Sequence, residues 1–169
     1  MWDGGGAARS ERSAPGEGGE VRVFRGRYEH TIDPKGRLSI PARYREELAG
    51  RRIDTLVLSE GDHCVSAFPL DQWEKLEEDF RRHSPFSPER RNVVRVMVAS
   101  AKECPVDRAG RILIPPELRE YAGLKKEVMI AGALDLFEIW SRDRWTDHRQ
   151  TLLGSSFDEM TRKLAELRP

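Results

Sequence analysis

Asp33-Pro34-Lys35-Gly36-Arg37-Leu38-Ser39-Ile40-Pro41 has a second version in this chain of 169 residues, Asp107-Arg108-Ala109-Gly110-Arg111-Ile112-Leu113-Ile114-Pro115. The two copies are offset by 74 residues (107 − 33), and the pairs Glu29/Glu103 and Arg45/Arg119 keep that offset. Trp73 and Trp145 differ by 72, which a small deletion explains. Self-similarity on this scale indicates repeated structural units. We therefore expect the chain to contain two copies of one half.

Each copy has the same order of expected elements. A short strand enters the Asp-x-x-Gly-Arg turn, and alternating apolar residues leave it as a second strand that ends at Pro41 or Pro115. A short helical turn, a hairpin and a longer helix follow in each half. The expected ranges are helical turns over 42–48 and 116–121, hairpins pairing 56–58 with 64–68 and 128–130 with 134–140, and helices from about Asp71 and from Ser141 as cap.

Two further segments have helical patterns. Ser87-Pro88-Glu89 is typical of a helix start, and although the valine-rich stretch 93–98 also suits a strand, we predict a helix there. Near the C-terminus, Phe157, Met160, Leu164 and Leu167 fall on one face of a helix. We expect this face to dock on the body of the protein; the alternative is contact with a neighbouring subunit.

The first residues are rich in Gly, Ser, Ala and Glu, a composition that buries too little apolar surface to order the chain. We therefore expect a disordered tail over 1–22, a first half over 23–85, a second half with its preceding helix over 86–150, and a C-terminal helix over 151–169. We also expect natural translation to start at Val23 or Val21, because a GTG start codon reads as valine when it lies inside a gene.

Composition excludes several classes of protein. No apolar run approaches the roughly 20 residues needed to cross a bilayer, and Cys64 and Cys104 lie far apart, so we expect a cytoplasmic protein with reduced thiols and no membrane partner. The net charge is zero, but residues 21–52 hold nine Lys and Arg against four Asp and Glu. Local basic patches must therefore carry any binding to nucleic acid.

The repeated turn supplies the candidate chemistry. Its aspartate can accept hydrogen bonds from backbone N–H groups, and its glycine adopts a positive φ at little cost. The arginine after it is thereby held in one direction, and a guanidinium suits phosphate oxygens and the O6/N7 edge of guanine. The candidate DNA-binding residues are Asp33, Lys35, Gly36, Arg37, Asp107, Arg108, Gly110 and Arg111. The alternative is that each aspartate only pairs with its arginine and closes the turn.

The residues around the first copy resemble a known family. Phe24-Arg25-Gly26-Arg27-Tyr28-Glu29-His30-Thr31-Ile32 leads into the turn and Ala42-Arg43-Tyr44-Arg45 follows it, a sequence similar to the opening of the MraZ family. The block from Asp107 to Leu118 is similar to that family too, and the resemblance spans about Phe24 to Trp145. Two such blocks in one short chain are far more specific than one.

The resemblance implies a mainly β fold with α-helices, in which two tandem AbrB-like halves form one intramolecular pseudo-dimeric swapped-hairpin barrel flanked by helices. It also implies a transcriptional regulator that forms a ring-shaped homo-oligomer and binds repeated boxes of double-stranded DNA in the promoter of the cell-division and cell-wall gene cluster, in association with the nucleoid. The family's DNA-binding positions correspond to Asp33, Lys35, Arg37, Asp107 and Arg111. The second turn departs from the first, because Ala109 replaces the lysine and Arg108 places the charge one position earlier.

Two rival interpretations remain. Asp62-His63-Cys64 suggests an enzyme or a metal site, but no second Cys-His cluster accompanies it, so we expect neither catalysis nor a metal. The chain also lacks a phosphate-cradling glycine motif, and we expect no cofactor. The second rival is an interaction module in which the barrel and helices assemble subunits and the turns are purely structural. Trp73, Trp140 and Trp145 suit core or interface positions better than base stacking.

Overall fold

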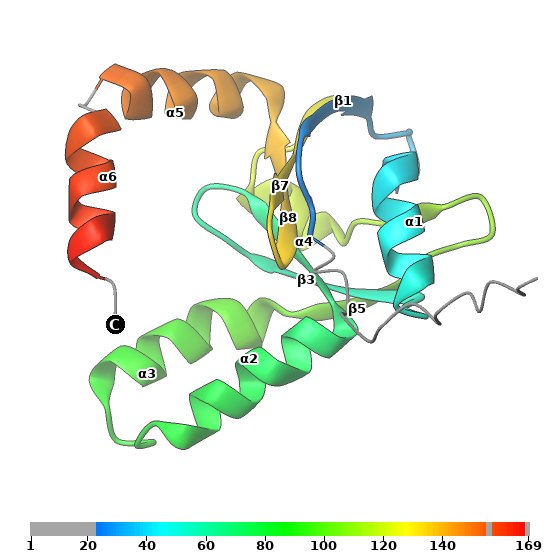
Figure 1. Ribbon diagram of the computed structural model, residues 1–169. Coiled ribbons are helices and arrows are strands. Elements are labelled where there is room, and N and C mark those ends of the chain that lie inside the picture. Colours follow the sequence, from blue (N-terminus) through cyan, green and yellow to red (C-terminus); the bar gives the residue numbers. More distant parts are fainter. Residues whose placement is uncertain (1–22, 155–156, 168–169) are drawn as a thin grey trace, which may run out of the picture.

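The computed structural model describes residues 23–154 and 157–167, so the predicted tail over 1–22 and the predicted start at Val21 or Val23 lie outside or at the edge of the described residues. The elements follow the predicted duplicated order (Figure 1). The first half contains β1 (Arg27–Thr31), β2 (Arg37–Ser39), α1 (Ala42–Gly50), β3 (Thr55–Glu60), β4 (Val65–Pro69) and α2 (Leu70–Arg82). A connecting helix, α3 (Pro88–Val93), continues as the π-helix η1 (Val94–Val98). The second half contains β5 (Lys102–Pro105), β6 (Arg111–Leu113), α4 (Pro116–Tyr121), β7 (Glu127–Ala133), β8 (Leu136–Ser141), α5 (Arg142–Gly154) and α6 (Phe157–Glu166).

Both halves contribute strands to one antiparallel sheet with the order β1-β7-β8-β4-β3-β5, in which the hairpins of the two halves lie side by side. The first strand of each half pairs with the hairpin of the other half: β1 lies beside β7, and β5 lies beside β3. The two strands that leave the repeated turns, β2 and β6, pair with each other as a separate two-stranded ribbon. Neither hairpin therefore has its full set of neighbours without the other half.

The duplicated, mainly β architecture with helices is thus confirmed, but the predicted swapped-hairpin barrel is not confirmed, and no closed barrel is found among the described residues. Among the described residues, the six-stranded sheet ends at β1 on one side and at β5 on the other. The short ribbon forms a sheet of its own instead of joining those edges. The reason is length, because β2 and β6 contain only three residues each and pair fully with one another.

The main core lies between the sheet, the ribbon and the helices α1 and α4. Leu38 and Ile112, which face each other across the ribbon, are fully buried, and Tyr44 of α1 is buried beside Phe24. The Tyr44 hydroxyl lies 3.0 Å from the carbonyl oxygens of both Arg25 and Gly26, to which it donates. Burial raises the pKa of this hydroxyl to about 12, so the group stays protonated and able to donate.

A second cluster explains why the connecting segment is helical. Val57, Phe68 and Trp73 form a buried group on the other face of the sheet, and partly buried Met97 and Val98 of η1 pack against it. Ser87 caps α3 by accepting a hydrogen bond from the backbone N–H of Arg90 at 3.3 Å. The predicted helix over this segment is confirmed, because capping and packing outweigh the strand preference of its valines. The predicted apolar stripe on α2 is also confirmed, with Trp73 its buried member.

The C-terminal helices differ from the prediction. Ser141 caps α5, as expected, by accepting a hydrogen bond from the backbone N–H of Arg144 at 3.4 Å. Helix α6, however, turns away from α5 and stands apart from the sheet (Figure 1), and Phe157 and Leu164 are 59% and 66% exposed. The predicted docking of this helix on the body is therefore wrong, because no described surface covers its apolar face within one chain. Among the described residues, no helix is long and apolar enough to span a membrane.

Candidate nucleic-acid interface

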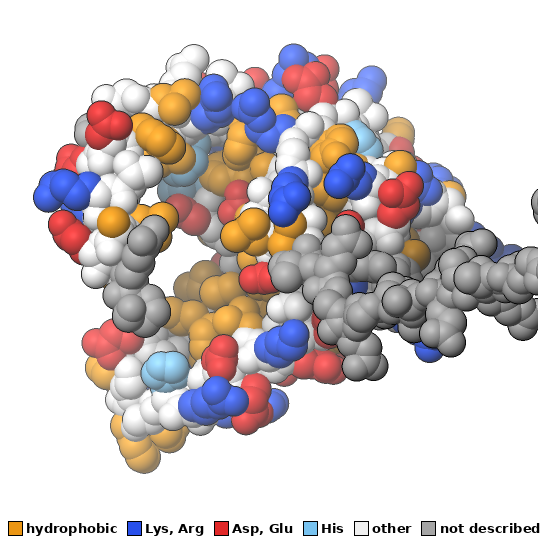
Figure 2. Space-filling model, in the orientation of Figure 1, with side chains coloured by type: hydrophobic (Ala, Val, Ile, Leu, Met, Phe, Trp, Pro, Cys, Tyr) orange, Lys and Arg blue, Asp and Glu red, His pale blue; other side chains and the backbone are white. Residues whose placement is uncertain are grey.

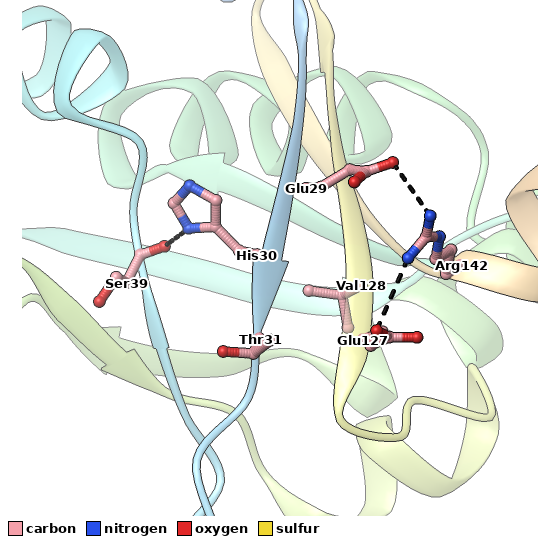
Figure 3. Close-up of a pocket in the computed structure, with 7 residues that line it drawn as sticks. All are labelled: Glu29, His30, Thr31, Ser39, Glu127, Val128 and Arg142. Atoms are coloured by element: carbon pink, nitrogen blue, oxygen red, sulfur yellow. Dashed lines mark hydrogen bonds and ion pairs between the residues drawn. The ribbon is translucent and has the colours of Figure 1, made fainter.

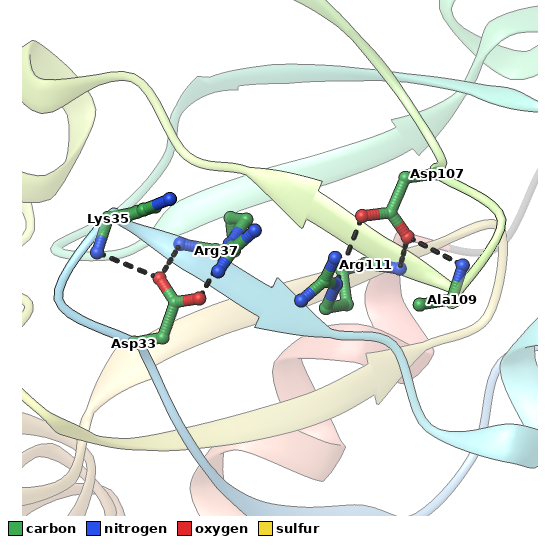
Figure 4. A network of polar contacts seen from close by, with 6 residues as sticks. All are labelled: Asp33, Lys35, Arg37, Asp107, Ala109 and Arg111. Carbon is green, nitrogen blue, oxygen red and sulfur yellow. Dashed lines mark hydrogen bonds and ion pairs between the residues drawn. The ribbon is translucent and has the colours of Figure 1, made fainter.

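The first repeated turn is closed by its aspartate. Asp33 Oδ1 accepts hydrogen bonds from the backbone N–H groups of Lys35 and Arg37, each at 2.9 Å, and Oδ2 accepts from Arg37 Nε at 2.6 Å. The backbone N–H of Gly36 donates to the carbonyl of Asp33 at 2.9 Å, with Gly36 at φ +87°. One carboxylate thus fixes both the backbone of the turn and the direction of the arginine side chain (Figure 4).

The second turn has the same geometry. Asp107 Oδ1 accepts from the backbone N–H groups of Ala109 and Arg111 at 2.9 Å, and Oδ2 accepts from Arg111 Nε at 3.0 Å. Gly110 has φ +75°. The replacement of Lys35 by Ala109 leaves this geometry unchanged because only the backbone N–H of that position is used. The departure between the two turns therefore concerns charge and not shape.

Both aspartates are held in the ionised form. The pKa of Asp33 is lowered, first by the backbone N–H of Arg37 and then by the Arg37 side chain and the backbone N–H of Lys35. The pKa of Asp107 is lowered by the corresponding groups of Arg111 and Ala109. At neutral pH each turn therefore contains a carboxylate that already accepts three hydrogen bonds from donors of its own turn.

The two turns meet on one surface. In the β2–β6 ribbon Leu38 pairs with Ile112, Arg37 with Leu113, and Ser39 with Arg111, so the ribbon has an approximate twofold axis at its centre. Arg37 and Arg111 are diagonal neighbours on the outward face, and their side chains are about one third exposed. Figure 4 shows the two Asp–Arg pairs at opposite ends of this ribbon.

The guanidinium groups keep free donors. Each arginine is bound to its aspartate through Nε, and within residues 23–154 and 157–167 no ion pair or hydrogen bond engages the terminal nitrogens of Arg37 or Arg111. Lys35 and Arg108 are exposed at the tips of the turns. All eight predicted site residues therefore lie on one ribbon and its two turns. The alternative interpretation, in which the aspartate closes the turn, describes the same geometry and leaves the outer donors available.

Two arginines that were not among the predicted site residues support the turns from the opposite half. A Cβ atom on Gly36 would lie 2.9 Å from Arg119 Cζ, and one on Gly110 would contact the side chain of Arg45. Arg119 also donates from Nε to the carbonyl of Ile114 at 3.0 Å. The offset of 74 residues between Arg45 and Arg119 was the signal that could have identified this pair.

The polar side chains that line a pocket beside β1 connect neighbouring elements of the fold (Figure 3). Arg142, at the start of α5, lies 3.6 Å from carboxylate oxygens of both Glu29 and Glu127, and so links β1, β7 and α5. His30 Nδ1 lies 2.7 Å from the carbonyl oxygen of Ser39 and ties β1 to β2. These contacts hold strands together and leave no nucleophile and base in contact.

The residues that suggested an enzyme do not form a reactive group. Cys64 is fully buried, and burial raises the pKa of its thiol well above its ordinary value. The negative charges of Glu138 and Asp62 raise this pKa further. The exposed side chain of His63 lies 3.5 Å from Asp62. Within the described part of the chain, no group of three or more His, Cys, Asp or Glu side chains could hold a metal ion.

Fold and site define a duplicated protein whose halves exchange strands and present paired Asp–Arg turns on a central ribbon. The family model described as "MraZ protein, putative antitoxin-like" matches the chain twice, over residues 23–96 and 97–167. The chain therefore belongs to the MraZ family, as the sequence indicated.

The chain is similar in sequence to several relatives over most of their length. The chain is 46% identical over 125 residues to "Transcriptional regulator MraZ" of Syntrophobacter fumaroxidans, covering 74% of this chain and 83% of that protein. It is 44% identical over 146 residues to the protein of the same name from Pelotomaculum thermopropionicum, covering 86% and 97%. A third, from Desulfitobacterium hafniense, is 48% identical over 126 residues, covering 75% and 86%. These relatives are named transcriptional regulators.

Proposed function

We propose that this protein is a sequence-specific DNA-binding transcriptional regulator that contacts duplex DNA through the β2–β6 ribbon and its two Asp-x-x-Gly-Arg turns. The observation that carries the proposal is the outward pair Arg37 and Arg111, each fixed by a carboxylate and each with free terminal donors. The names of the relatives support a regulator role. We further propose that its target is repeated boxes in the promoter of the cell-division and cell-wall gene cluster, and that it associates with the nucleoid.

The two-stranded form of the ribbon supports this mode of binding. The major groove of B-DNA is about 12 Å wide and admits a two-stranded β-ribbon. Arg37, Ser39, Arg111 and Leu113 form the outward face, with Leu113 57% exposed. An arginine fork can bind guanine O6 and N7, and an apolar side chain can contact a thymine methyl group. In this proposal Asp33 and Asp107 position the arginines, while Lys35 and Arg108 add phosphate contacts.

Assembly into a ring-shaped homo-oligomer belongs to the same proposal. The apolar face of α6 lies uncovered, and Figure 2 shows hydrophobic side chains on that side of the molecule. A second copy of the chain is the partner we propose for this face. Because one ribbon carries few cations in a protein with no net charge, several ribbons that bind successive boxes would raise the effective concentration and strengthen weak single contacts.

The test is a fluorescence-anisotropy titration of the protein and of Arg37→Ala against the promoter DNA, with scrambled DNA of the same length. Each arginine contact to a base is worth about 1–3 kcal/mol, so we expect Arg37→Ala to lose much of the preference for the promoter. Arg37→Lys keeps the charge but lacks the fork and should lose preference more than affinity. Arg82→Ala, on exposed α2, is the control for charge and should behave as the unmodified protein.

The rival is an oligomeric interaction module whose turns are purely structural. It predicts that all four proteins bind promoter and scrambled DNA alike, or bind neither. That result, with unchanged unfolding midpoints and unchanged oligomeric state, would overturn the regulator proposal. The division into a half over 23–85 and a half over 86–150 remains a proposal about the repeat unit, since the two halves share one sheet.

A further inference from the structure

The two turns differ in what lies beside them. A pocket of about 620 Å³ adjoins the first turn, and its lining includes Asp33, Pro34, Arg119, Lys125 and Lys126. The one carboxylate in this group is already occupied by Arg37 and by backbone N–H groups. Three cations therefore line this pocket against a single carboxylate, which already accepts three hydrogen bonds.

The two lysines are fixed in place by their backbone but not by their side chains. The carbonyl of Lys126 accepts a hydrogen bond from the backbone N–H of Ile32 at 2.8 Å, which holds the segment against the entrance to the first turn. Lys125 and Lys126 are exposed, and within the described residues their ammonium groups form no ion pair. Arg119 lies against Gly36, so the pocket is continuous with the turn itself.

The second turn lacks this arrangement. Val106, which is 74 residues after Ile32, donates its backbone N–H to the carbonyl of Asp54 at 2.8 Å. Asp54 therefore occupies the position beside the second turn that Lys126 occupies beside the first, and a carboxylate replaces an ammonium group. Arg45 lies against Gly110 as Arg119 lies against Gly36, so the difference comes from the segment before β3 and β7.

We propose that the pocket formed by Arg119, Lys125 and Lys126 binds a backbone phosphate of the duplex next to the nucleotide that Arg37 contacts. The inference rests on the proposed function and adds to it a phosphate site on one side of the ribbon only. Three cationic side chains line the pocket against one ion-paired carboxylate, and this excess of positive charge suits an anion. Asp33 and Pro34 of the first turn line the same pocket, so a phosphate bound there would lie beside the turn that carries Arg37.

The experiment measures how the DNA affinity depends on salt. Each phosphate contact contributes about 0.9 to the slope of log affinity against log salt. We expect Lys125→Ala/Lys126→Ala to weaken binding to promoter and scrambled DNA by the same factor and to reduce the slope by about 1–2. The matched control Lys75→Ala/Arg82→Ala removes the same charge from α2 and should leave the slope unchanged. The reciprocal change Asp54→Lys should strengthen binding and steepen the slope by about 1.

The outcomes separate this inference from the proposed function. An unchanged slope in Lys125→Ala/Lys126→Ala, with the promoter preference of the unmodified protein intact, overturns the phosphate site alone. A loss confined to promoter DNA also overturns it, because a phosphate contact is insensitive to sequence. If the unmodified protein binds both DNAs equally, the proposed sequence specificity fails, while a reduced slope on scrambled DNA still supports the phosphate site. No binding to either DNA overturns both.

Discussion

Asp33 and Asp107 each have two roles in one side chain. One oxygen of each carboxylate accepts two backbone N–H bonds, and the other accepts from the arginine four residues later. The same carboxylate therefore determines the shape of the turn and the direction of the donor it presents. An arginine that is mobile before binding loses rotamer entropy when it binds. Because the carboxylate already holds the arginine in one direction, this entropy loss is smaller and binding is favoured.

Gly36 is the residue at which this turn tolerates least change. Gly36→Ala places a Cβ atom 2.9 Å from Arg119 Cζ at φ +87°, where residues other than glycine are strained. We expect a loss of about 1–3 kcal/mol in the free energy of unfolding, measured by chemical denaturation. Gly154→Ala, where an added Cβ meets no atom within 4 Å, is the control and should change stability by less than about 0.5 kcal/mol. Equal effects at the two glycines would contradict the argument.

The lowered pKa values of Asp33 and Asp107 predict how acid affects stability. A carboxyl whose folded pKa is below its unfolded value stabilises the fold above the unfolded pKa, near 3.8, and loses this contribution as the pH falls through the folded pKa. We expect Asp33→Asn/Asp107→Asn to lose stability at neutral pH but to change less than the unmodified protein between pH 5 and roughly pH 2. Urea unfolding across that range is the measurement, and parallel curves would contradict the role of the two carboxylates.

The placement of the eight candidate residues in two matching turns and the strands that follow them could be predicted from the sequence, because the chemistry of a turn is local. An aspartate, a glycine and an arginine at these spacings dictate the same hydrogen bonds wherever they fold. Arg45 and Arg119 were not predicted as site residues because each contacts the turn of the other half. That contact depends on how the two halves exchange strands. Lys125 and Lys126 left no signal at all, since Asp54 takes the corresponding place and the repeat is broken there.

Among the elements, α6 stands out for what it leaves exposed. Leu164 and Leu167 are 66% and 77% exposed, on the same face as Phe157 and the partly buried Met160. Burial of such side chains contributes roughly 1.5–3 kcal/mol each. An uncovered face of this kind favours association, and we have proposed a second copy of the chain as its partner.

The prediction for α6 concerns the size of the proposed homo-oligomer. We expect Phe157→Glu/Leu164→Glu to shift the protein toward the monomer, because carboxylates on the apolar face oppose its burial. Light scattering after size-exclusion chromatography gives the mass. Arg162→Glu, on the opposite face of the helix, adds a carboxylate without touching the apolar side and should keep the assembly intact. An oligomer that survives the double change shows that another surface joins the subunits.

The bounds of hairpins and helices were predicted to within a few residues where the signals, such as caps and apolar periodicity, lie within the element itself. The helix over Pro88–Val98 illustrates this, because its cap at Ser87 is written in the sequence. The docking of α6 was predicted wrongly for a physical reason. A periodic apolar face shows that a helix needs a partner, but the period contains no information about which surface provides it.

At the scale of the whole molecule, exchange of strands makes the two halves depend on each other. Each half supplies one strand to the hairpin of the other, β1 to β7 and β5 to β3, and the ribbon takes one strand from each. This order follows from contacts distant in sequence, which local patterns do not reveal. The internal repeat predicted the duplication and the family resemblance predicted the mainly β class, while the swapped-hairpin barrel that it implied is not confirmed and no closed barrel is found among the described residues.

We expect the halves to unfold in one cooperative step. Because Leu38 and Ile112 face each other in the shared core, loss of either half removes packing from both. Native-state hydrogen exchange should give the amides of β3 and β7 the same free energy of opening, equal to that of global unfolding. Ile112→Ala, in the second half, should lower both values by about 2–5 kcal/mol. Protection lost only in the second half would mean that the halves are independent.

The ribbon's approximate twofold axis has a consequence for orientation. A DNA-binding homodimer with twofold symmetry presents the same surface in either direction along a duplex, so it binds equally well in both orientations. Here both halves belong to one chain, and the position that Lys126 occupies beside the first turn is occupied by Asp54 beside the second. The two ends of the ribbon are therefore chemically different, and in the proposed complex this difference gives the protein a direction along the duplex. On a directly repeated target, neighbouring copies would all point the same way.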